Sequence, residues 1–106
     1  MKKITYHKLV RDKIPEIIEK DGKIAVTSIL SDEEYMEALD KKLMEEIKEY
    51  QESKDIEELA DILEVIYAIA KAKNRSICEL EDIRRNKADK RGSFDRKVFL
   101  KEVIEN

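Results

Sequence analysis

One stretch of the chain, residues 59–72 (LADILEVIYAIAKA), restricts the fold more than any other feature. Wound as a helix, it carries apolar side chains on nearly every face, so other helices or another chain must cover it. It therefore predicts the central helix of a helical domain or oligomer. The chain has only 2 glycines and 1 proline among 106 residues. This scarcity disfavours a turn-rich β fold and permits long helices.

Local signals place the ends of the helices. A serine followed three residues later by a glutamate, the capping-box pattern, occurs at Ser31–Glu34 and at Ser76–Glu79. Pro15 fits the first turn of a short helix near the N-terminus. Together with the spacing of apolar residues, these signals predict four helices, over residues 13–20, 32–52, 56–73 and 77–90.

The remaining segments lack helical periodicity. Residues 1–10 and 23–30 are predicted to be extended, and the tail from Phe94 onward fits either a short strand or a last helix. The length predicts one domain, residues 1–106. We therefore expect an all-α fold, a four- to five-helix bundle built on an antiparallel helical hairpin, with short extended segments outside it.

Four carboxylates lie symmetrically about the break at residues 53–54, between the two helices of the predicted hairpin. Glu46 and Glu49 precede the break by the same distances at which Asp61 and Glu58 follow it. In an antiparallel hairpin, equidistant residues lie at the same height, and the i, i+3 spacing puts each pair on one helix face. Four like charges converging there cannot all stay ionised without a cation. The pattern predicts a site for a hard divalent metal such as Mg²⁺, which prefers oxygen ligands.

A solvated helix face is the ordinary explanation for such charges. Against it, Asp61 and Glu64 are the only charged residues between Leu59 and Ala70, in the most apolar helix of the chain. A charge buried there is costly unless it is paired or bound to metal. A competing role exists for Glu58, as the capping-box partner of Asp55 at the start of the same helix.

Magnesium held by carboxylates keeps waters and binds substrate phosphates, and a carboxylate that is not fully used as a ligand can accept a proton from an attacking water. Glu49 and Glu64 are the candidates for that catalytic role. Basic side chains are also expected near the phosphate oxygens. The chain offers two basic clusters for substrate binding, which contain Lys8, Arg11 and Lys13, and Lys87 and Arg91.

The composition argues against several other classes of protein. The net charge is −3 with mixed signs, and tryptophan is absent, so the basic field and aromatic platform of a nucleic-acid binder are missing. A single cysteine, Cys78, and a single histidine, His7, provide neither a disulfide nor a cysteine- or histidine-rich metal site. With no apolar run long enough for a signal peptide or a membrane span, we expect a cytoplasmic protein that binds no membrane.

These residues also resemble a known family. EEIKE (45–49) followed by ELAD (58–61) resembles the EExxE…ExxD signature of the all-α nucleoside triphosphate pyrophosphohydrolase superfamily, the MazG-like group that includes the phosphoribosyl-ATP pyrophosphohydrolases. KLVRDKIPEII (8–18) and KADKRGSF (87–94) resemble the ends of a compact MazG-like subfamily of this length. The resemblance covers nearly the whole chain.

The resemblance implies a Mg²⁺-dependent hydrolase, for which Mn²⁺ can substitute, that splits the α–β phosphoanhydride of a nucleotide into a monophosphate and pyrophosphate. It also implies a homodimer or higher homo-oligomer with a nucleotide as its substrate. Two alternatives stay open: a phosphoribosyl-ATP pyrophosphohydrolase of histidine biosynthesis, and a helical metal-binding or interaction module without catalysis. Carried over to this chain, the metal ligands are Glu46, Glu49, Glu58 and Asp61.

Overall fold

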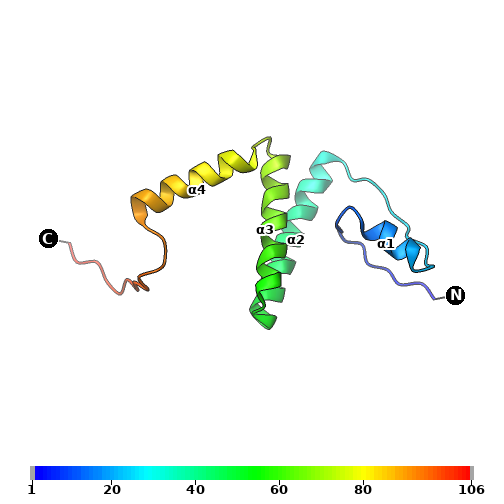
Figure 1. Ribbon diagram of the computed structural model, residues 1–106, viewed down its shortest axis with the longest axis horizontal. Coiled ribbons are helices and arrows are strands. Elements are labelled where there is room, and N and C mark those ends of the chain that lie inside the picture. The colour runs from blue at the N-terminus through cyan, green and yellow to red at the C-terminus, as the bar shows by residue number, and fades with distance from the viewer. Residues whose placement is uncertain (1, 106) are drawn as a thin grey trace.

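The computed structural model describes residues 2–105, and that part of the chain contains four α helices and no β strand (Figure 1). The predicted all-α class is therefore confirmed, and each helix end lies within one residue of its predicted position. The helices are α1 (Ile14–Lys20), α2 (Asp32–Ser53), α3 (Ile56–Ala72) and α4 (Ile77–Arg91).

Both predicted capping boxes are formed. At the start of α2, the Ser31 hydroxyl accepts a hydrogen bond from the Glu34 N–H, and the Glu34 carboxylate accepts one from the Ser31 N–H, both at 3.2 Å. Ser76 and Glu79 do the same at the start of α4. Asp55 precedes α3 but makes no side-chain capping bond. Because no capping box forms there, the Glu58 carboxylate is not held in the competing structural role.

The antiparallel hairpin of α2 and α3 is the centre of the molecule (Figure 1). Its turn depends on Lys54, which adopts a left-handed conformation (φ 61°) and donates its N–H to the Tyr50 carbonyl at 2.7 Å. The predominantly apolar helix α3 packs along α2 and also contacts α4, as the sequence predicted for a central helix. Within residues 2–105, the buried apolar side chains are Leu39, Val65 and Ala70, each at most 8% exposed.

The rest of the chain extends away from the hairpin. The N-terminal segment and α1 lie on one side, and α4 and the C-terminal tail lie on the other (Figure 1). The molecule measures 71 × 32 × 23 Å, and its radius of gyration is 19.0 Å, compared with about 13 Å for a compact domain of this length. One chain therefore covers only part of its own apolar surface.

None of the three segments with undecided or extended predictions has regular secondary structure in the described residues. Residues 2–10 form neither helix nor strand. Residues 22–31 form neither helix nor strand, and the tail beyond α4 contains only a turn near Asp95 before it extends through residue 105. Neither the strand nor the helix that fits the tail sequence is present there. In residues 22–31 and in the tail the reason is a lack of partners, because most of the large apolar side chains face solvent; Val26, Ile29, Phe94 and Phe99 are at least 84% exposed.

Within the described residues, no helix combines the length and the hydropathy that crossing a bilayer requires.

Candidate functional site

Three carboxylates from two helices meet in the half of the hairpin that is nearer its turn. Glu46 extends from α2, and Glu58 and Asp61 extend from α3; each offers an oxygen atom, and these atoms all lie within 4.8 Å of one another. The spacing follows from the fold. Asp61 lies three residues beyond Glu58, so both point from one face of α3, and the antiparallel turn brings Glu46 opposite them.

Glu46 is the buried member of this cluster, at 7% exposure. One of its oxygens, Oε1, lies 3.4 Å from the Nζ of Lys42. The other, Oε2, is fully shielded from solvent and has no hydrogen-bond partner within the described residues. A buried carboxylate oxygen without a partner is costly, and a cation bound at that atom would remove the cost.

Burial, together with the crowding of like charges, raises the pKa of two members of the cluster. Burial, followed by the nearby charge of Glu49, raises the pKa of Glu46 above its ordinary value, and Lys42 offsets part of this effect. Loss of water contact, followed by the charges of Asp61 and Glu46, raises the pKa of Glu58. Both groups therefore resist ionisation more than a free glutamate does, as expected where a positive charge is needed.

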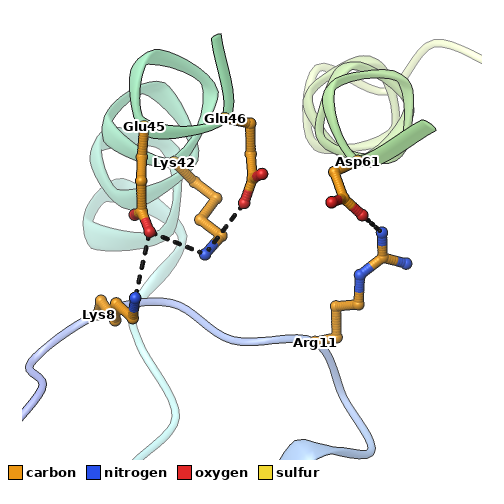
Figure 2. A network of polar contacts seen from close by, with 6 residues as sticks. All are labelled: Lys8, Arg11, Lys42, Glu45, Glu46 and Asp61. Carbon is orange, nitrogen blue, oxygen red and sulfur yellow. Dashed lines mark hydrogen bonds and ion pairs between the residues drawn. The ribbon is translucent and has the colours of Figure 1, made fainter. Parts of the chain in front are cut away.

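Three basic side chains pair with the carboxylates around this cluster (Figure 2). Lys42, from α2 itself, lies between Glu45 and Glu46, at 3.5 and 3.4 Å. The other two come from the segment before α1, and Figure 2 shows them reaching up to the hairpin from below.

Each of these two contacts a different helix. The Nζ of Lys8 lies 3.1 Å from Glu45 on α2, and this hydrogen bond raises the pKa of Lys8. The guanidinium of Arg11 donates to Asp61 Oδ1 on α3 at 2.7 Å and lies 4.0 Å from Glu64.

Between the helices and this segment is a hollow of about 250 Å³. The residues that line it combine three carboxylates, two cations and two apolar side chains: Val10, Arg11, Ile14, Lys42, Glu46, Glu49 and Asp61. A hydrated divalent cation fits such a lining, since Mg²⁺ takes one or two carboxylates and completes its shell with water and phosphate oxygens.

The structure places the two candidate catalytic carboxylates differently. Glu49 lines the hollow, although it is not among the three carboxylates whose oxygens come together. Glu64 is more than half exposed on α3, and its charged neighbour is Arg11.

The candidate substrate-binding residues separate into two groups. Lys8 and Arg11 lie at the carboxylates, and Lys13 directly precedes α1, exposed to solvent. Lys87 and Arg91 lie toward the far end of α4, which extends away from the hairpin on the side opposite the N-terminal segment (Figure 1). Within one chain, the structure does not bring this second group to the carboxylates.

Sequence reasoning missed Lys42. Its side chain is only 17% exposed and contacts the buried Glu46. The signal was present, because Lys42 precedes Glu45 by three residues and Glu46 by four, the spacings at which helix side chains pair. In a chain with 22 basic residues, such spacings are common, and only the burial distinguishes this one.

Comparison with known proteins assigns no family. No protein-family model matches the chain, and no solved structure matches it. A curated protein of Mycolicibacterium smegmatis (strain ATCC 700084 / mc(2)155), described as an uncharacterized protein, is 56% identical to this chain over 41 residues. The matched region is 39% of this chain and 42% of that relative, so the chain spans less than half of the relative's length.

Proposed function

We propose that this protein is a MazG-like, Mg²⁺-dependent nucleotide pyrophosphohydrolase that acts in the cytoplasm. It hydrolyses the α–β phosphoanhydride of a nucleoside triphosphate to a monophosphate and pyrophosphate. One observation carries the proposal: carboxylate oxygens of Glu46, Glu58 and Asp61 lie within 4.8 Å of one another, and a buried oxygen of Glu46 has no partner. The EExxE…ExxD pattern of the sequence supplies the reaction class.

The metal would be held by Glu46, Glu58 and Asp61, with Glu49 beside them. When bound there, a divalent cation supplies positive charge to the phosphate oxygens and lowers the pKa of a water. Glu49 then accepts the proton of the attacking water. It is favoured over Glu64 because it lines the hollow, whereas Glu64 is more than half exposed and faces Arg11.

The chain's own cations would bind and orient the nucleotide. Arg11 and Lys8 lie at the edge of the carboxylate cluster, and a guanidinium can donate two parallel hydrogen bonds to a phosphate. Val10 and Ile14 give the hollow an apolar border that limits the access of water to the reacting phosphates.

We propose further that the working form is a homodimer or a higher homo-oligomer. The small core, the radius of gyration of 19.0 Å and the exposed apolar side chains support this. In such an assembly, Lys87 and Arg91 of one copy could serve the carboxylates of another, since they lie far from those of their own chain. Light scattering tests the assembly: we expect a mass of at least twice 12.5 kDa, and a strict monomer would contradict it.

A non-catalytic helical module remains a second candidate, favoured by the ion pairs of Arg11 with Asp61 and of Lys42 with Glu46. These pairs balance part of the acidic charge without a metal. The histidine-pathway alternative differs only in its substrate, which would be phosphoribosyl-ATP in preference to ordinary triphosphates.

One experiment separates these functions. The full chain is incubated with Mg²⁺ and each of a panel of nucleoside triphosphates, deoxynucleoside triphosphates and phosphoribosyl-ATP, and pyrophosphate and orthophosphate are measured separately. We expect pyrophosphate and a nucleoside monophosphate in equal amounts. Orthophosphate alone would contradict α–β cleavage, and no product from any nucleotide would favour the non-catalytic module.

A further inference from the structure

The segment before and into α1 lies across the hollow and is attached to both helices of the hairpin. We name residues 8–14 the strap. Lys8 anchors it to Glu45 on α2, and Arg11 anchors it to Asp61 on α3 (Figure 2). Between and beyond these anchors, Val10 and Ile14 line the hollow. The strap therefore lies over the carboxylate cluster and is held there by charge.

The anchor on α3 uses a carboxylate of the cluster itself. Arg11 donates to Asp61 Oδ1 at 2.7 Å, and Asp61 is one of the three residues whose oxygens converge. A divalent cation bound among these oxygens would lie next to the guanidinium, and two positive charges on one carboxylate repel each other. Mg²⁺ also needs room for several coordinated waters, on the side where the strap lies.

The two cations that touch the cluster are not equally free to leave. Lys42 is fixed on α2, with its side chain 17% exposed. Arg11 is 55% exposed and belongs to a stretch without helix or strand. An exposed ion pair of this kind contributes little to stability, so the Arg11 anchor is the one that a metal can displace.

We infer that Arg11 is a built-in placeholder cation, which holds the strap closed over the cluster until a divalent metal takes Asp61 and releases it. The inference rests on the proposed metal site. The freed guanidinium remains at the edge of the hollow, where the phosphate oxygens of a nucleotide are its next anionic partners. Metal binding thus prepares the site for substrate, and because such coupling is reciprocal, the closed strap weakens metal binding.

Metal affinity tests this coupling without any turnover. Mn²⁺ binding to the full chain is followed by calorimetry or by electron paramagnetic resonance, for the wild type, Arg11→Gln and Arg75→Gln. Arg75 is a matched control, because its guanidinium forms an exposed ion pair with Glu79 at 3.1 Å outside the hollow. We expect Arg11→Gln to bind Mn²⁺ about tenfold more tightly than the wild type, and Arg75→Gln to bind it as the wild type does.

A second measurement follows the strap itself. With Mn²⁺ at saturation, trypsin should cut the wild type faster after Lys8, Arg11 and Lys13, relative to cleavage after Arg75 in the same digest. Circular dichroism checks the fold of the variants, and we expect both to remain helical because each change removes only an exposed ion pair.

The outcomes separate the strap from the enzymatic proposal. Unchanged or weaker Mn²⁺ binding in Arg11→Gln, or equal cleavage of the strap with and without Mn²⁺, overturns the placeholder role even if the protein hydrolyses nucleotides. Tighter binding with metal-dependent cleavage supports it even if no nucleotide is hydrolysed. A wild type that binds no Mn²⁺ overturns both the strap and the metal site.

Discussion

The two sides of the carboxylate hollow are built in different ways. On α2, Glu46 is 7% exposed, and its cation, Lys42, comes from the preceding turn of the same helix. On α3, the Asp61 side chain is 40% exposed, and its cation, Arg11, comes from a segment 50 residues earlier in the chain. The α2 side is thus a fixed, partly dehydrated support, whereas the α3 side is an exposed contact that can exchange partners.

The largest expected effect is a loss of catalytic turnover, and it should be the same for substitutions on either side of the hollow. If both supply metal ligands, Glu46→Gln and Asp61→Asn should each reduce Mg²⁺-dependent turnover by about 100-fold or more. The amides keep the shape but lose the charge that binds the cation. Steady-state pyrophosphate release measures the loss.

Glu37→Gln, an exposed glutamate on α2 outside the hollow, is the control and should retain activity. Full turnover in either test variant would remove that residue from the ligand set and leave the site on one helix alone.

The second expected effect is smaller and differs between the two sides: it is the loss of folding stability when the cation of each side is removed. Lys42→Met leaves Glu46 buried without its cation, and we expect this to cost about 2 kcal/mol of unfolding free energy in the absence of metal. Arg11→Met should cost less than about 1 kcal/mol, because its ion pair is exposed. Urea denaturation followed by circular dichroism gives both values.

The double variant Lys42→Met/Glu46→Gln sharpens this result. Removing the buried charge together with its partner should restore most of the lost stability, because no unpaired charge remains. Equal costs for Lys42→Met and Arg11→Met would refute the contrast between a fixed and an exchangeable side.

The smallest expected effect is a dependence on pH. In the folded state, the pKa values of Glu46 and Glu58 are raised above 4.5, so the folded protein holds these protons more tightly than the unfolded chain does. Stability from these groups is therefore greatest at low pH and is lost as the pH rises above 4.5 through the raised values. Bound Mg²⁺ should replace the protons.

Thermal melts with and without Mg²⁺ across this range measure the effect. The Mg²⁺-induced rise in melting temperature should shrink as the pH falls from 7 toward 4.5, since protons and metal compete for the same oxygens. In Glu46→Gln, the rise should be small at every pH. A Mg²⁺ effect that is constant with pH would place the metal elsewhere.

The helices were predictable because their signals are local. Capping boxes at Ser31 and Ser76 and the apolar run of α3 each act within a few residues, so the helix ends fell within one residue of expectation. The tail after Gly92 was not predictable, because its apolar residues can form a strand or a helix only against a partner surface, and the described chain provides none.

The candidate site likewise has one part that local sequence signals predicted and another part that they did not. The sequence by itself predicted that four carboxylates would converge, Glu46, Glu49, Glu58 and Asp61, since the helical repeat and a short turn fix their faces and heights. Oxygens of three of them do come together, and Glu49 is not in that group. Only the tertiary structure decided their surroundings: the burial of Glu46, the selection of Lys42 among many lysines, and the meeting of Arg11 with Asp61. Burial and ion pairing depend on which distant segments exclude water or bring a charge, and no local pattern of residues encodes that choice.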